Sequence, residues 1–199
     1  MVMPANSTGI EIGRLATLYP GRIGHLYSPG AQRGPWSFIP YALDNGAFVA
    51  FDKKKTWDPG PWRQLLLWAA MSGQKPLWAL VPDVVGDRVA TIESWQRYVD
   101  EVTRFGFRPA FAAQDGMTPA DVPIDDCVVF IGGSTQWKLD AIATWSAALP
   151  GRVHIGRVNT WDRILKSYRA GAVSADGSGL FRSPGQKNEL MKFLRETSS

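Results

Sequence analysis

Cysteine and histidine are scarce in this sequence. The single cysteine, Cys127, rules out a disulfide within the chain and a cysteine-rich zinc site, and it suits a reducing compartment, so we expect a cytoplasmic protein. The two histidines, His25 and His154, lie far apart, so neither a metal-binding histidine cluster nor a Ser-His-Asp arrangement stands out. His154 falls in an apolar run and is interpreted as a core residue. We expect no metal ion and no cofactor.

Long apolar runs and nucleotide-binding signatures are also missing. No stretch approaches the ~20 apolar residues of a membrane helix, and residues 1–13 lack the regions of a signal peptide. Neither a Gly-x-x-x-x-Gly-Lys phosphate loop nor a Gly-x-Gly-x-x-Gly turn that opens a helix occurs. These absences argue against membrane insertion and secretion, and they narrow the chemistry available to the chain.

The sequence does contain enough apolar residues for one core. With 199 residues, 45% of them hydrophobic, the chain is short for two independent cores, so we expect a single domain, 1–199. The 22 Lys and Arg residues slightly outnumber the 18 Asp and Glu residues, and the pI is near 9.3. This mildly basic balance is compatible with a polyanionic partner but does not by itself indicate one.

Short apolar runs alternate with segments of helical spacing. The runs are almost continuously hydrophobic, which is typical of strands buried on both faces of a parallel sheet. They occupy residues 23–27, 39–43, 77–81, 109–113, 127–131, 153–158 and 172–175. The helical segments occupy residues 62–71, 89–105, 139–149 and 161–170. This alternation predicts an α/β fold of repeated strand-helix units.

The pattern predicts seven strands, one fewer than a closed barrel of this type has. An eighth strand near residues 9–12, or in the connection 44–57, would complete a compact (β/α)8 barrel of the TIM type. We predict this barrel, with a complete or an irregular form left open. The runner-up is an open, doubly wound sheet, which fits the same pattern.

Polar residues and glycines gather where the predicted strands end. In both candidate folds the carboxyl ends of the strands converge, so these groups are expected at one site. Asp44, Asp83 and Asp176 are the carboxylates among them, although each alone would serve equally well in a turn or a helix cap. Three crowded carboxylates repel one another, so we expect at least one raised pKa. Such groups suit chemistry at a glycosidic carbon, where a carboxylate stabilises or captures an oxocarbenium-like transition state.

The ordered motifs of residues 40–182 resemble those of the tRNA-guanine transglycosylases, in particular their shorter deazapurine DNA-modification relatives of phages and bacteria. Residues 43–48, Leu-Asp-Asn-Gly-Ala-Phe, are similar to the family's Asp-Ser-Gly-Gly-Tyr segment. This implies that Asp44 handles protons on the departing or incoming base, with Asn45 and Gly46 also at the substrate. Residues 81–83, Val-Pro-Asp, resemble the segment whose Asp reads the Watson-Crick edge of the purine, which implies that role for Asp83.

The remaining motifs complete the resemblance. Gln114 lies in a segment similar to the family's Gln-Gly motif and would hydrogen-bond the base. Gly132 and Gly133 resemble the Gly-Gly turn whose backbone lines the base pocket. The segment that ends at Asp176 is similar to the one bearing the catalytic aspartate, which makes Asp176 the nucleophile. Arg157 lies in the preceding strand segment and is assigned a phosphate or sugar contact.

The sequence departs from the family after the catalytic aspartate. Members that act on tRNA carry a Cys/Cys/Cys/His zinc subdomain there, whereas residues 186–199 contain neither Cys nor His. A barrel without zinc and without that subdomain fits the DNA-acting branch better than tRNA binding. The basic residues expected to contact the nucleic-acid backbone are Lys53, Lys54, Arg182 and Lys187.

The predicted function is therefore the exchange of guanine in DNA for a 7-deazaguanine such as preQ0, through a covalent aspartyl-glycosyl intermediate. DNA rather than RNA and the free deazaguanine are the expected partners, and the small size of the chain leaves room for accessory proteins. Three alternatives stay open. They are an N-glycosidase that uses water in place of the second base, a tRNA-acting base-exchange enzyme, and an inactive nucleic-acid-binding module.

Overall fold

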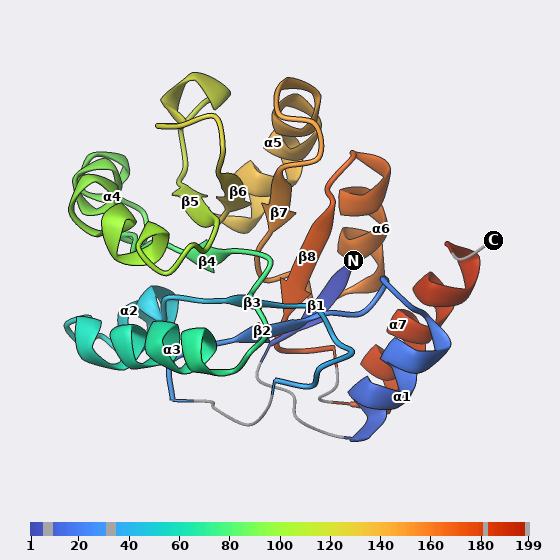
Figure 1. Cartoon of the computed structure of the whole chain (residues 1–199). Helices are drawn as coiled ribbons and strands as arrows, with labels where there is room; N and C mark the ends of the chain where they lie inside the picture. Colours follow the sequence, from blue (N-terminus) through green and yellow to red (C-terminus); the bar gives the residue numbers. More distant parts are fainter. Residues whose placement is uncertain (6–9, 31–34, 181–182, 198–199) are drawn as a thin grey trace.

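A computed structural model describes residues 1–5, 10–30, 35–180 and 183–197 of the chain (Figure 1). Its strands form one eight-stranded sheet with the order β1-β8-β7-β6-β5-β4-β3-β2, in which every ladder is parallel. The strands are β1 (Val2–Pro4), β2 (His25–Tyr27), β3 (Tyr41–Leu43), β4 (Ala79–Leu80), β5 (Pro109–Ala113), β6 (Val128–Ile131), β7 (Val153–Ile155) and β8 (Ser174–Gly177). Parallel neighbours require crossover connections, and helices supply most of them.

The first strand brings the sheet nearly to closure. β1 pairs with β8, with Met3 opposite Asp176, and its other edge meets β2 and the residues before it through isolated bridges. There the Val2 N–H donates to the Arg22 carbonyl at 2.8 Å, and the Gly24 N–H donates to the Val2 carbonyl at 2.9 Å. The fold is therefore the predicted (β/α)8 barrel, irregular at this seam, and not an open doubly wound sheet.

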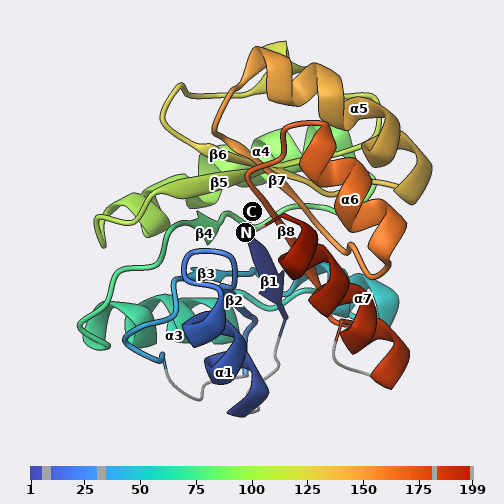
Figure 2. The ribbon, with the colours of Figure 1, turned by 90° about the vertical axis from the view of Figure 1, so that its right-hand side faces the viewer.

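Helices surround the strands (Figures 1 and 2). They are α1 (Ile10–Leu18), α2 (Ala47–Asp52), α3 (Pro59–Met71), α4 (Arg88–Thr103), α5 (Thr135–Ala148), α6 (Trp161–Arg169), α7 (Pro184–Glu196) and the short 3-10 helix η1 (Pro119–Asp121). Helix starts follow local capping rules, since the Asp58 carboxylate accepts the Gly60 N–H at 2.9 Å and the Asp87 carboxylate accepts the Ala90 N–H at 3.0 Å. None of the helices in the described ranges is both long and apolar enough to cross a membrane.

Both predicted positions of the eighth strand were wrong. Residues 10–12 begin α1, which buries Ile12 and Leu15 at helical spacing, and the connection 44–57 contains α2. The eighth strand is β1, a segment of only three residues, Val-Met-Pro. So short a strand is defined by its partners, β8 above all, and carries no periodic signal of its own.

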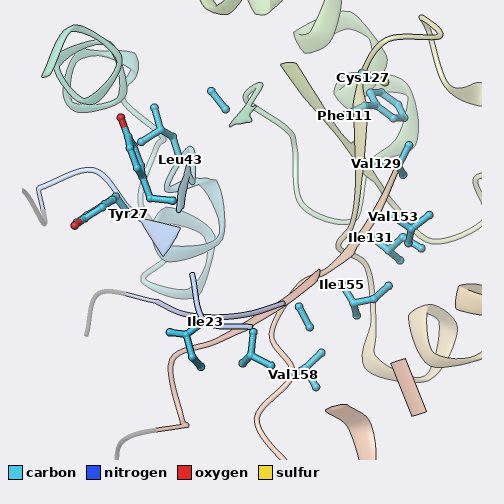
Figure 3. Close-up of a cluster of buried hydrophobic side chains, with 14 of the residues drawn as sticks. Ile23, Tyr27, Leu43, Phe111, Cys127, Val129, Ile131, Val153, Ile155 and Val158 are labelled. Carbon is cyan, nitrogen blue, oxygen red and sulfur yellow. The ribbon is translucent and has the colours of Figure 1, made fainter. Parts of the chain in front are cut away.

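Successive strand residues alternate between two apolar layers. Outward-facing residues pack under the helices and form the main core, including Phe111, Val129, Ile131, Val153 and Ile155 (Figure 3). Inward-facing residues fill the barrel itself, and they are Met3, Leu26, Ala42, Trp78, Leu80, Ala110, Ala112 and Val128. The barrel interior is thus filled by packed side chains, as in other barrels of this type. On β7 and β8 the corresponding buried positions carry polar residues, His154, Ser174 and Asp176.

Candidate active site

A cavity of about 480 Å³ opens where the strands end, a size typical of small-molecule sites. It brings together most of the residues predicted from the sequence as catalytic or substrate-binding. Those that line it are Asp44, Asn45, Asp83, Gln114, Gly132, Gly133, Arg157 and Asp176. Gly46 is not among the lining residues.

Asp176, on β8, is the carboxylate of the cavity with the smallest solvent-exposed fraction. Its side chain is buried, and Oδ1 lies 3.1 Å from Nε2 of His154 and accepts the Arg157 backbone N–H at 3.2 Å. His154 is fully buried, as expected of a core residue, but it also contacts Asp176, a pairing that was not predicted from the sequence. The available signal was the alternation of β7, which places His154 on the opposite face from Val153 and Ile155 and therefore inside the barrel.

Asp44 follows β3 and shares the cavity with Asp176. Its Oδ2 accepts the Ser28 hydroxyl at 2.8 Å, and its Oδ1 accepts the Asn45 backbone N–H at 2.8 Å. Burial raises the pKa of Asp44 to about 6, the Ser28 hydrogen bond opposes this, and the neighbouring charges of Asp176 and Asp83 add to it. The raised pKa that the sequence led us to expect is therefore present, but burial is its main cause and the crowding of carboxylates only adds to it. A carboxyl group of this kind can both donate and accept a proton near neutral pH.

Asp83, after β4, is held by two amide side chains. Asn45 Nδ2 donates to Oδ1 and Gln114 Nε2 donates to Oδ2, each at 2.8 Å. Burial raises the pKa of Asp83, and these two hydrogen bonds oppose that rise. Gln114 also accepts the Gly86 N–H at 3.0 Å, and both amide residues are 1% exposed. In this structure Asn45 and Gln114 therefore orient Asp83 toward the cavity.

The glycines of the site have conformational roles. Gly46 precedes α2 with φ 76°, a left-handed conformation, and a Cβ there would lie 3.2 Å from the Pro29 ring. Gly133 has φ 49°, and a Cβ there would collide with Asp115 Oδ1, which holds the Ser134 N–H at 2.6 Å. Gly132 and Gly133 both line the cavity and carry no side chain there.

Arg157 is the cation of the cavity wall. Its guanidinium lies 4.1 Å from the centre of the Phe48 ring on α2 and donates a hydrogen bond to the Gly133 carbonyl. Burial lowers the pKa of Arg157, while the charges of Asp176 and Asp83 act in the opposite direction. Its backbone has φ 58°, unusual for a residue with a side chain. A fixed positive charge beside Asp176 and Asp83 limits the repulsion between these carboxylates and can meet an anionic group of a ligand.

The basic residues predicted to contact the nucleic-acid backbone do not all lie near the cavity. Lys53 and Lys54 are exposed and directly follow α2. Because Phe48 of α2 lines the cavity, these two lysines lie near the cavity opening. Lys187 instead pairs with Glu11 at 2.7 Å between α7 and α1 and does not line the cavity. Arg182 lies outside the described residues. Arg163, which was not predicted from the sequence, does line the cavity.

Lys138, on α5, lies close to the site and was not predicted from the sequence. The side chain is buried, and its Nζ donates to the Gly156 carbonyl at 2.6 Å. Burial, with a smaller contribution from Arg157, lowers the pKa of Lys138 to about 7. Within the described ranges, no three His, Cys, Asp or Glu side chains are arranged to hold a metal ion.

We expect Asp44→Asn to stabilise the fold at neutral pH. The pKa of Asp44 is raised from 3.8 to about 6, so the native state binds its proton more tightly, and stability is lost as pH rises from about 4 through about 6. Asparagine keeps an acceptor for the Asn45 N–H and carries no charge. Urea unfolding should show the variant about 1–3 kcal/mol more stable than the wild type at pH 7 and nearly equal below pH 4. A constant difference across this range would contradict the assignment.

No protein-family model and no curated protein matches the chain. Solved structures do match. A mutant tryptophan synthase alpha-subunit from Pyrococcus furiosus is 17% identical, with a TM-score of 0.56 over 98% of this chain and 94% of that chain. A chain of the tryptophan synthase a2b2 complex from the same organism is 15% identical, with a TM-score of 0.55 over 99% and 95%. The native KDPGal structure is 14% identical, with a TM-score of 0.54 over 98% and 93%. At these identities the likeness establishes the compact (β/α)8 barrel and says nothing about the reaction.

Proposed function

We propose that this chain is an enzyme, a guanine transglycosylase that replaces guanine in DNA by a 7-deazaguanine such as preQ0. The observation that carries the proposal is the pairing of two different aspartates in one cavity. Asp176 is buried and fixed through Oδ1, whereas Asp44 has a pKa raised to about 6. A nucleophile and a proton-transfer group are what base exchange at a glycosidic carbon requires. The motif resemblance to tRNA-guanine transglycosylases points to the same reaction.

The reaction is a double displacement. An oxygen of Asp176 attacks C1′ of the target deoxyguanosine, the glycosidic C–N bond breaks, and guanine leaves with the proton that Asp44 donates. The 7-deazaguanine then attacks C1′ and gives a proton back to Asp44, while the aspartyl-glycosyl bond breaks. Two inversions retain the configuration at C1′. The positive charge that develops on the sugar is stabilised by the carboxylates around it.

Recognition of the purine falls to Asp83 and to the bare backbone of the Gly132–Gly133 turn. Asp83 is oriented by Asn45 and Gln114, so its position does not depend on the ligand. Arg157 supplies a cation for the phosphate or sugar of the same nucleotide. Because C1′ is inaccessible in a stacked duplex, the target nucleotide must leave the stack, at a cost of a few kcal/mol. Lys53 and Lys54, beside the mouth, are suited to backbone contacts that offset this cost.

The proposal is tested by incubating the protein with guanine-containing DNA and preQ0, followed by digestion and nucleoside mass spectrometry. We expect the deazaguanine nucleoside to appear in DNA together with free guanine. Abasic sites formed without added base would instead identify an N-glycosidase. Exchange in tRNA but not in DNA would move the enzyme to the RNA branch of the family. DNA binding without turnover would leave only a binding module.

A further inference from the structure

His154 lies under Asp176, inside the barrel. Its ring is packed against Trp78, with centroids 4.8 Å apart, and is stacked on Phe130 at 4.9 Å. Both ring nitrogens are within hydrogen-bond distance of β8. Nε2 lies 3.1 Å from Asp176 Oδ1, and Nδ1 lies 2.7 Å from the Ser174 hydroxyl oxygen. A buried imidazole needs hydrogen-bond partners, and here both of them come from the strand that carries Asp176.

We propose that Ser174 and His154 position the Asp176 carboxylate by fixing the tautomer of the imidazole. An ionised carboxylate can only accept, so the proton between His154 and Asp176 must be on Nε2. A neutral imidazole then has a bare Nδ1, which needs a donor, and the Ser174 hydroxyl supplies it. Ser174 thereby selects the Nε2–H tautomer, and Nε2–H holds Oδ1. The part that this pair plays in catalysis rests on the proposed function.

As a consequence, the two oxygens of Asp176 differ in their hydrogen bonds and in the role we assign to each. Oδ1 accepts from His154 Nε2 and from the Arg157 backbone N–H, whereas no described hydrogen bond reaches Oδ2. Oδ2 is therefore the atom that attacks C1′. Lys138 supports the same arrangement, because its Nζ donates to the carbonyl of Gly156 and so fixes the backbone directly before Arg157. Reactions lose rate steeply when a nucleophile is misdirected, so a fixed Oδ1 favours the reactive orientation of Oδ2.

A matched pair of variants separates positioning from packing. Glutamine and methionine have similar length and shape, but only glutamine offers an N–H close to the position of Nε2. We expect His154→Gln to keep kcat for base exchange within about 10-fold of wild type, and His154→Met to lower it about 10- to 100-fold, with KM for DNA unchanged in both. Ser174→Ala is expected to lower kcat without changing KM. Equal kcat values for the glutamine and methionine variants would overturn the proposal.

The tautomer itself is measured without any substrate, by 15N NMR of protein labelled in histidine. We expect His154 in the wild type to carry its proton on Nε2, and Ser174→Ala to give a mixture of tautomers. A proton on Nδ1, protons on both nitrogens, or an unchanged tautomer in Ser174→Ala would each refute the role of Ser174. If the wild type exchanges no guanine, the proposed function fails, while the NMR experiment still decides whether Ser174 and His154 hold Asp176 as inferred.

Discussion

Asp176→Ala is expected to lower guanine exchange by at least about 10⁴-fold, because it removes the proposed nucleophile of the covalent intermediate. Asp176→Asn should behave in the same way, since an amide has the shape of the carboxylate but is a poor nucleophile. Exchange is measured with DNA and preQ0 in a single-turnover assay. The protein-DNA adduct is measured by denaturing electrophoresis after reaction with DNA in the absence of preQ0.

Asp115→Asn provides the matched control. Asp115 also follows a strand, β5, but its Oδ1 holds the Ser134 N–H, an acceptor role that asparagine retains, and it does not line the cavity. We therefore expect near wild-type exchange from this variant. An adduct that still forms in Asp176→Ala would show that another carboxylate attacks C1′.

Asp44→Asn is expected to lower kcat/KM for DNA by about 10² to 10⁴-fold through loss of the proton that guanine takes as it leaves. In the wild type the protonated form of Asp44 is abundant below its pKa of about 6 and declines above it. The rate of guanine departure should therefore fall as pH rises beyond about 6. The residual activity of the variant should lack this fall. Both are measured as kcat/KM between about pH 5 and pH 8, which reports groups of the free enzyme.

Ser28→Ala tests the same assignment in the opposite sense. The Ser28 hydroxyl donates to Asp44 Oδ2 and stabilises the ionised form, so its removal should raise the pKa of Asp44 further. The fall in rate should then begin at higher pH than in the wild type. If Ser28→Ala left the pH dependence of the rate unchanged, the titration would belong to a different group.

Asp44→Asn is also predicted to stabilise the fold at pH 7. A variant that is slower but more stable than the wild type would therefore show that the activity is lost through the chemistry and not through unfolding.

The barrel and the gathering of its strand-end residues were predictable from sequence because both follow from one rule. Parallel strands joined by helices bring their carboxyl ends together, so Asp44, Asp83 and Asp176 meet although they are far apart in the chain. What the rule cannot give is which polar groups face each other. That Asn45 and Gln114 are committed to Asp83 depends on the arrangement of neighbouring loops, which no local pattern encodes.

Other features escaped prediction for identifiable reasons. β1 is a strand of three residues whose extended form depends on its neighbours. Lys138 stands in a helix where a lysine would ordinarily face solvent, but it is buried and donates to the Gly156 carbonyl, a contact that no local pattern encodes. His154 lies in an apolar run, which favours a packing interpretation, and only the alternation of the strand places it under Asp176.

The pairing of the first strand with the last also bears on when the cavity can be assembled during folding. Asp44 and Asp83 lie on neighbouring strands early in the chain, but Asp176 is on β8, which is flanked by β7 and β1. Contacts between residues so distant in sequence form late, because a long loop must close first. Asp176 takes its anchoring contacts from His154 and Arg157, which are only 22 and 19 residues away, but it shares a cavity with Asp44 and Asp83 only when the strands curl into the barrel. The three carboxylates are therefore assembled at one place only in the completed barrel.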